Sequence, residues 1–332
     1  MGGVWLGYVL LLSVVVLWVV SGFFIQNLFS TNYNHPVAMT VFSVGMCSVL
    51  LLVLPVYERV LYVCAVSDPL VCRRASKHVL SVSTALLGSV WLLGQLTYNV
   101  SLTYLTVSAS TAVSSVSPVF TFIFSVWILG YHLSVLSVVG VCVSVVGILC
   151  VATLGDNASV VGICIGVVSC ASYGLFTTLL KRQQTLLSLP TNVVYVFGQF
   201  GLVALIIGVP LVCAVNFLGL DFWEFPSQYA IFGMCVNALI GSVLSDVLLA
   251  QSVLLLDPVT VAMGLALTMP FSLLIDSTVL KLHDFKFDYI WGIAAQFLAI
   301  YCIAKDQHNV YPPVKHVYKP PHENNVYKPA PV

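Results

Sequence analysis

Long apolar segments recur along the whole chain, and they limit its fold more than any other feature. A helix needs roughly 20 mostly apolar residues to cross a bilayer. The hydropathy of the sequence predicts about ten such segments. We therefore expect an all-α integral membrane protein of about ten transmembrane helices. The expected segments are residues 4–24, 36–56, 79–102, 105–129, 133–154, 160–180, 192–215, 228–256, 259–280 and 289–304.

Composition excludes several other classes of protein. Hydrophobic residues make up 60% of the chain and charged residues 7%, whereas soluble proteins carry about 25% charged residues. The net charge is zero, so we expect no nucleic-acid partner. The cysteines form no Cys-x-x-Cys pair and no Cys/His cluster at zinc spacing, so we expect no metal and no cofactor.

The positive charges predict the orientation in the membrane. If the segments alternate, Arg73, Lys181 and Lys305 mark one side, and only Lys281 and Lys286 lie on the other. Cytosolic loops carry the excess of Lys and Arg. This segregation predicts that both termini are cytosolic.

The two halves of the chain share a pattern. Pro118 is followed by His132, and Pro270 is followed by His283, at nearly the same spacing. Because each half holds about five segments, the second copy would enter the membrane upside down, as in carriers built from inverted repeats. The predicted units are a first repeat at residues 1–154, an inverted repeat at residues 155–304 and a tail at residues 305–332.

The stretch 108–130 is uncharged, but its first half is rich in hydroxyl groups. Two rows of these residues recur at helical spacing, and Pro118 should leave a backbone carbonyl without its usual partner. Such a helix should face protein or water. It forms either a tight helix–helix contact or a cavity wall, and the matching helix around Pro270 favours the wall. The rows are Ser108, Thr111, Ser115 and Pro118, beside Ser110, Ser114, Ser117 and Thr121.

Two acids lie within the apolar segments, Asp246 and Asp276. An acid inside a membrane usually faces a cavity and marks a path for substrate or protons. Asp246 can also be a structural hydrogen-bonding acid, and Asp276 lies near enough to the non-cytosolic end to reach water. Together with polar residues in or near the segments, they define the expected solute-binding residues. These are Asp246, Asn237, Ser115, Pro118, Pro270, Asp276, Asn99 and Gln95.

The tail changes composition abruptly and repeats Val-Tyr followed by Pro, as in the stretch 310–313. Such a segment cannot bury enough surface to fold, so we expect it to be disordered. It is either an inert spacer or a docking segment, and residues 311–314 have the form of a sorting-adaptor signal.

Three stretches resemble the drug/metabolite transporter superfamily, and within it the F-type branch of solute carrier family 35. They are residues 221–226, 237–246 and 266–276, and the resemblance covers residues 4–304. It implies an EamA-like carrier of ten helices in two inverted repeats with cytosolic termini, residing in an endomembrane (Golgi, endoplasmic reticulum, vacuole or lysosome) rather than the plasma membrane. Asp246 stands where the branch would carry Glu.

The expected function is a carrier for a small organic solute, not an enzyme, since no segment carries a nucleophile elbow or a metal motif. The absence of Lys and Arg inside the segments argues against a bound pyrophosphate, so we favour a cationic, zwitterionic or neutral metabolite. The resemblance implies a thiamine-like or nucleoside-like solute, with nucleotide-sugars as the alternative. A scaffold acting through its tail is a second alternative. Expected partners are the solute, the lipid bilayer, a sorting adaptor on the tail and a second copy in a homodimer.

Overall fold

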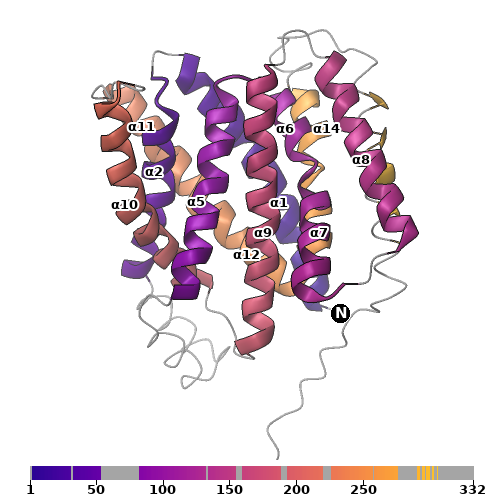
Figure 1. Ribbon diagram of the computed structural model, residues 1–332. Helices are drawn as coiled ribbons and strands as arrows, with labels where there is room; N and C mark the ends of the chain where they lie inside the picture. Colours follow the sequence, from indigo (N-terminus) through magenta and orange to yellow (C-terminus); the bar gives the residue numbers. More distant parts are fainter. Residues whose placement is uncertain are drawn as a thin grey trace, which may run out of the picture.

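The computed structural model forms a bundle of helices packed side by side (Figure 1). It describes residues 2–30, 33–53, 82–131, 134–154, 159–187, 193–219, 226–256 and 258–275, with short pieces between 290 and 305. All elements in this part of the chain are helical. In order they are α1 (Gly2–Ser30), α2 (Pro36–Gly45), the 3₁₀ turn η1 (Met46–Val49), α5 (Val82–Leu102), α6 (Val107–Ser114), α7 (Ser117–Leu129), α8 (Val135–Leu154), α9 (Val160–Leu187), α10 (Val193–Phe217), α11 (Gln228–Val236), the π-helical segment η2 (Asn237–Leu244), α12 (Ser245–Leu255), α13 (Pro258–Leu265) and α14 (Thr268–Ile275).

The helices have the length and composition of membrane spans. Seven described segments are long and apolar enough to cross a bilayer: α1, α2 with its extension, α6–α7, α9, α10, α11–α12 and α13–α14. Helices α5 and α8 run alongside them (Figure 1). The prediction of an all-α integral membrane protein is therefore confirmed. The expected segment at 289–304 and the tail from 305 lie mostly outside the described residues.

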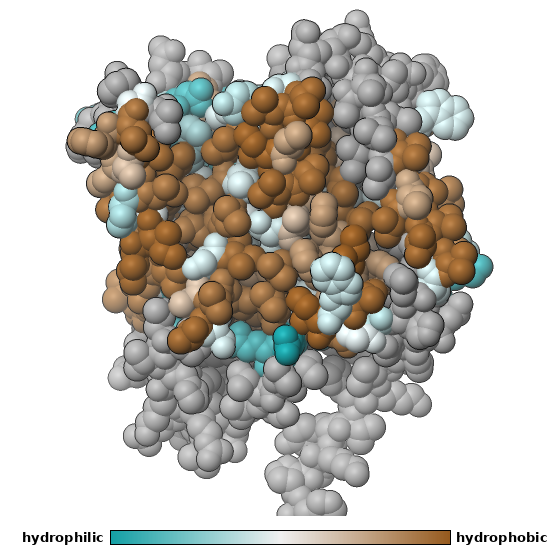
Figure 2. All heavy atoms as spheres, in the orientation of Figure 1, coloured by the Kyte–Doolittle hydropathy of each residue, from teal (hydrophilic) through white to brown (hydrophobic). Residues whose placement is uncertain are grey.

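The outer surface of the bundle is apolar. Figure 2 shows hydrophobic residues covering most of the described part of this face. Leu86, Val146 and Ile206 are among the large hydrophobic side chains that are exposed on the helices. An apolar surface of this extent suits contact with lipid tails and would be unfavourable in water.

Two of the expected segments keep the length and composition of a membrane span, but a two-residue turn divides each into two helices, and we call them the broken helices. Ser115–Val116 separate α6 from α7, and Ala266–Leu267 separate α13 from α14. Helices α6 and α13 each have 8 residues. Pro118 and Pro270 both lie in the first turn of the second half, where a proline, which has no N–H, is readily accommodated.

The broken helices pack against each other in opposite directions. Helix α6 contacts α14, and α7 contacts α13. The first half of each broken helix therefore lies against the second half of the other, and the two breaks fall close together within the bundle.

Apolar clusters fill the bundle on both sides of the level at which the two breaks lie. In the half where α1 begins, Trp91, Phe176, Phe197 and Phe200 form a buried aromatic core, with ring centroids 4.6 Å apart for Trp91–Phe176 and 5.1 Å for Phe197–Phe200. A second cluster includes Ile25 from the far end of α1 and residues of α2, α5 and α11. These clusters leave the middle of the bundle to polar side chains.

Glycines allow α10 to approach α2 and η1 closely. A Cβ atom on Gly201 would overlap the backbone nitrogen of Ser48, and one on Gly208 would meet Val41 Cγ2 at 2.5 Å. Small residues at helix interfaces permit this packing inside membranes.

Candidate solute-binding site

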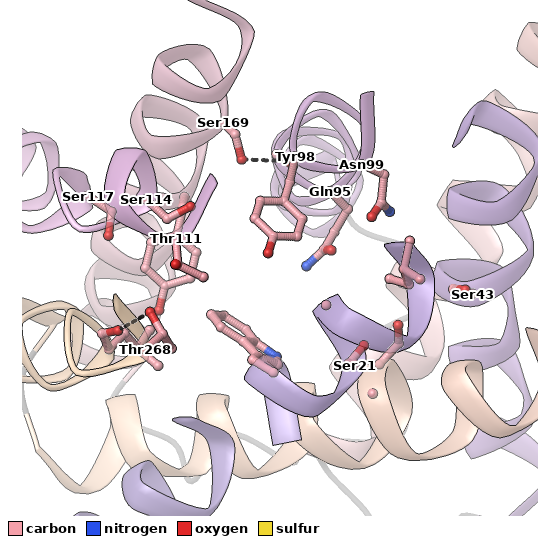
Figure 3. Close-up of a pocket in the computed structure, with 18 of the residues that line it drawn as sticks. Ser21, Ser43, Gln95, Tyr98, Asn99, Thr111, Ser114, Ser117, Ser169 and Thr268 are labelled. Carbon is pink, nitrogen blue, oxygen red and sulfur yellow. Dashed lines mark hydrogen bonds between the residues drawn. The ribbon is translucent and has the colours of Figure 1, made fainter. Parts of the chain in front are cut away.

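A cavity lies in the middle of the bundle, between the two apolar clusters (Figure 3). Its volume is about 120 Å³ for the centres of water-sized molecules. One water needs about 10–15 Å³ on this measure, so the cavity has room for a small solute with several polar groups. The polar residues that line it are Ser21, Ser43, Gln95, Tyr98, Asn99, Thr111, Ser114, Ser117, Ser169, Tyr173, Asn237, Ser242 and Thr268.

The lining offers hydroxyl and amide groups instead of charges. Among the described residues, no Asp, Glu, Lys, Arg or His side chain lines the cavity. Groups of three or more potential metal ligands are also absent from the described part of the chain. This chemistry suits a ligand that is recognised by hydrogen bonds and ring contacts.

Asn99 presents a hydrogen-bond acceptor. Its Nδ2 donates to Thr40 Oγ1 at 2.8 Å, and Thr40 Oγ1 donates to the Pro36 carbonyl at 2.6 Å. Because the single hydroxyl proton of Thr40 is used by Pro36, the Thr40 oxygen accepts from Asn99, which fixes the orientation of the amide. Asn99 Oδ1 is buried without a partner in the structure, and is the acceptor left for a ligand.

Asn237 has the opposite arrangement. Ser21 Oγ donates to Asn237 Oδ1 at 2.6 Å. This bond occupies the amide oxygen and leaves Nδ2 as the donor that the side chain offers. A Cβ atom on Gly241 would collide with Ser21 Oγ, so the glycine makes room for the bond.

The other predicted amide, Gln95, points toward the centre of the cavity from α5 (Figure 3). Thus Gln95, Asn99 and Asn237, which are far apart in sequence, surround one space. Whether they bind a solute stays a prediction.

The broken helices supply the opposite wall. Thr111 and Ser114 of α6, Ser117 of α7 and Thr268 of α14 all line the cavity. The Thr268 hydroxyl donates to the Leu265 carbonyl at 2.7 Å. In the first broken helix the hydroxyl of Ser115 makes the same kind of bond, to the Ala112 carbonyl at 2.6 Å. Hydroxyl groups thus satisfy backbone carbonyls at both breaks.

Aromatic rings close the remaining sides. Trp18 and Tyr173 meet edge to face with centroids 6.1 Å apart, and Tyr98 and Trp91 also line the cavity. Trp91 Nε1 and the Tyr173 hydroxyl are buried without a hydrogen-bond partner. A planar ligand would therefore meet both ring faces and unused polar atoms.

Asp246 lies outside this lining. It follows η2 at the start of α12, its side chain is 1% exposed, and neither carboxyl oxygen has a hydrogen-bond partner in the structure. The interpretation of Asp246 as a structural hydrogen-bonding acid therefore finds no partner among the described residues.

The other predicted residues have mixed positions. Ser115 and Pro118 are buried beside the cavity, at the break and in the first turn of α7, but do not line it. Pro270 is half-buried in α14 and does not line it either. Asp276 lies outside the described residues.

Several lining residues were not predicted. Ser21 and Trp18 of α1 lie in the first expected segment, and neither they nor Tyr98 and Tyr173 are among the residues predicted to bind a solute. On the broken helix, Thr111, Ser114 and Ser117 line the cavity together. Thr111 and Ser114 belong to different rows, but they lie three residues apart on α6, so both face the same side of that helix.

Comparison with known proteins finds similarity to transporters. Residues 5–153 match the EamA-like transporter family. The chain is 25% identical to the thiamine-repressible mitochondrial transport protein THI74 of Saccharomyces cerevisiae, over 64% of this chain and 60% of that protein. It is also 25% identical to solute carrier family 35 member F5 of Mus musculus, over 64% of this chain and 42% of that protein. The matches thus span about half of these relatives' length.

An uncharacterized transporter of Schizosaccharomyces pombe is 25% identical over 92% of this chain and 97% of its own length. A solved crystal structure shares the fold, with a TM-score of 0.60 over 92% of this chain and 98% of that one, at 11% identity. The helices are those of a multi-pass membrane protein, and the matched relatives include proteins described as transporters. The comparisons confirm the resemblance to the drug/metabolite transporter superfamily and to the F-type branch of solute carrier family 35.

Proposed function

We propose that the chain is a carrier that moves a small organic solute by alternating access, with the solute bound in the central cavity. The observation that carries this proposal is the meeting of two broken helices beside a cavity lined with hydroxyl and amide groups. Interrupted helices near the bilayer midplane are where carriers built from inverted repeats bind their substrates.

The matching breaks also support a division of the chain into two inverted repeats, at residues 1–154 and 155–304. Helices α6 and α13 have equal lengths, and each is followed by a two-residue break and a proline in the next turn. In this proposal the two repeats rock against each other. The cavity then opens first on the side of the aromatic core and next on the side of the smaller apolar cluster.

The lining favours an uncharged, planar solute with both donor and acceptor groups. Asn99 Oδ1 would accept a hydrogen bond from the solute, Asn237 Nδ2 would donate one, and the rings of Trp18 and Tyr98 would contact its faces. A nucleoside-like molecule has these properties. A thiamine-like cation is the second candidate, because aromatic faces attract cations and the name of one relative mentions thiamine.

Nucleotide-sugars fit the lining less well. Diphosphates are usually bound by Arg and Lys, and neither lines the cavity among the described residues. A scaffold acting through its tail is the remaining alternative, and it would not need a polar cavity at mid-depth.

The orientation of the chain and the membrane in which it resides are also proposals. The segregation of Lys and Arg supports cytosolic termini, and an endomembrane is proposed because one relative is described as a vacuolar membrane protein. A sorting adaptor on residues 305–332 and a homodimer stay proposals.

A thermal-shift screen of the purified full-length protein tests the function. The panel contains thiamine, uridine, adenosine, UDP-glucose and GDP-mannose, each at saturating concentration. We expect an uncharged or cationic compound to raise the Tm, because a ligand at 100 times its Kd stabilises by about 2.7 kcal/mol. The shift should be smaller in Asn99→Leu and in Asn237→Leu, and unchanged in the matched control Gln251→Leu, whose side chain is exposed on α12.

Exchange of UDP-glucose or GDP-mannose in counterflow would overturn the proposed solute class. Deletion of residues 305–332 separates the carrier from the scaffold. A carrier keeps its solute flux without the tail, whereas a scaffold loses its role.

A further inference from the structure

Asp246 is a buried acid that the cavity does not use. Both carboxyl oxygens are enclosed and without a hydrogen bond in the structure. An ionised carboxylate in such a place has lost its water without gaining a partner, which is strongly unfavourable. The geometry therefore favours the protonated, uncharged carboxyl group in this conformation.

No described cation is near enough to change that conclusion. The titratable groups within electrostatic range of Asp246 are Cys47 on η1 and Tyr173 on α9, both neutral in ordinary conditions. The helices α1, α10 and α13, which pack against α12, carry no Asp, Glu, Lys or Arg. Lys181 binds the carbonyls at the other end of α12, and the first of these, on Val253, is about 10 Å along the helix.

Two rings of the cavity lining, those of Trp18 and Tyr173, form an aromatic wall near Asp246. Trp18 Nε1 donates to the hydroxyl of Ser245, the neighbour of Asp246, at 3.1 Å. The Trp18 ring contacts the Tyr173 ring, and both residues line the cavity. The Tyr173 hydroxyl, which has no partner, lies within the same wall.

A π-helical segment precedes the helix that carries Asp246. The eight-residue π segment η2 runs from the cavity residue Asn237 to Leu244, directly before α12. Stretches of π-helix are rare in proteins, and those that occur are often found at functional sites. A return of η2 to α-helical geometry would turn α12 relative to α11 and change the surroundings of Asp246.

We propose that Asp246 is a proton-binding site, distinct from the solute cavity, that couples transport to a proton gradient. This inference rests on the proposed carrier function. In the described conformation the carboxyl group holds its proton behind Trp18 and Tyr173. When the bundle opens, water reaches the acid, and its proton passes to that water and leaves a carboxylate. Once the bundle has closed on that side and opened to the other, the carboxylate takes up a proton from the water there, so that one proton crosses per cycle.

Infrared difference spectroscopy of the reconstituted full-length protein tests the protonated state without any solute. We expect a protonated-carboxyl band at neutral pH that is lost in Asp246→Asn and retained in Asp246→Glu. Asp288→Asn is the matched control, since it alters an acid expected to face water, and it should leave the band unchanged. In wild-type protein labelled with ¹³C at the aspartate carboxyl carbon, the band should shift, which keeps the test decisive if Asp246→Asn does not assemble. Absence of the band in the wild type, or its persistence in Asp246→Asn, would overturn the proposal.

Tryptophan fluorescence gives a second readout, because Trp18 lies against the segment that carries the acid. We expect the wild type to change its emission as the pH rises, and Asp246→Asn and Trp18→Phe to lose that change. An identical pH response in wild type and Asp246→Asn would count against the site. Neither measurement needs a solute, so a failure here leaves the carrier proposal standing. A failure to find any transported solute leaves these two results unchanged.

Discussion

The hydroxyl groups of Thr111 on α6 and Ser272 on α14 lie 2.6 Å apart and join the two broken helices. Ser272 Oγ is also within hydrogen-bond distance of the Met269 carbonyl, at 2.9 Å. In the bond between Thr111 and Ser272, either hydroxyl group can be the donor. This bond links the first half of one broken helix to the second half of the other, beside the cavity.

A double-mutant cycle measures this link. Thr111→Val and Ser272→Ala should each destabilise the folded protein, and their coupling energy should be about 0.6 kcal/mol, with about 1.7 as the upper range for such bonds in membranes. Unfolding in mixed micelles gives the values. Thr121→Val is the control, because Thr121 donates within its own helix, to Ser117. Equal coupling of Ser272 to Thr111 and to Thr121 would contradict the described contact.

Gly201→Ala should weaken the packing of α10 on η1. The new Cβ atom would overlap the backbone nitrogen of Ser48, and backbone cannot move aside as a flexible side chain can. We expect the free energy of unfolding to fall by about 1–3 kcal/mol, as at other overpacked sites. The fall should appear as a lower Tm when samples are heated and then analysed by size-exclusion chromatography. Gly94→Ala is the matched control, because its Cβ would be in ordinary contact at 3.4 Å from Ser172. An unchanged Tm in Gly201→Ala would show that this interface is looser than described.

Lys181 caps the end of α12. Its Nζ donates to the Leu256 carbonyl at 3.0 Å and to the carbonyls of Val253 and Leu254 at 3.4 Å. A cation at a helix C-terminus stabilises it by about 0.3–1 kcal/mol. Lys181→Met should lower the Tm by the amount that corresponds to this stabilisation. Lys181→Arg keeps the positive charge and should retain most of the stabilisation. Arg182→Met is the control, since Arg182 is exposed, and a larger effect there than at Lys181 would argue against the cap.

Thr40 should affect solute binding through Asn99. In Thr40→Val the amide of Asn99 loses the acceptor that fixes its orientation. We expect Asn99→Leu to weaken binding about 5- to 150-fold, the range for leaving a polar group unpaired, and Thr40→Val to weaken it less. Isothermal titration with the compound found in the thermal-shift screen gives the affinities. A larger effect of Thr40→Val than of Asn99→Leu would mean that Thr40 itself contacts the solute.

The sequence predicts the membrane spans well, because the apolar side chains that face lipid are also what hydropathy measures. It also indicates the importance of Pro118 and Pro270, since a proline changes backbone hydrogen bonding wherever it lies in a helix. It does not predict that each segment breaks into two helices. That outcome depends on Ser115 and Thr268 satisfying carbonyls locally and on the two helices supporting each other.

The cavity is harder to predict for a related reason. Asn99 and Asn237 stand out in apolar segments, but Ser21 and Trp18 do not, because a single serine or tryptophan is common in membrane helices. The position of Asp246 behind an aromatic wall depends on η2, a π segment that no spacing rule anticipates. Asp246, an ionisable residue inside a membrane segment, thus lies next to a serine that bonds to the cavity residue Trp18, but does not itself line the cavity.

The central claim is that a solute crosses through the cavity between the broken helices. The most direct measurement is counterflow in proteoliposomes loaded with a mixture of uncharged and cationic metabolites, followed by mass spectrometry. The account predicts that wild-type protein exchanges at least one of them, and that Asn99→Leu combined with Asn237→Leu reduces this exchange at least tenfold while Gln251→Leu does not. Equal exchange by the wild type, the cavity variant and protein-free liposomes would contradict it.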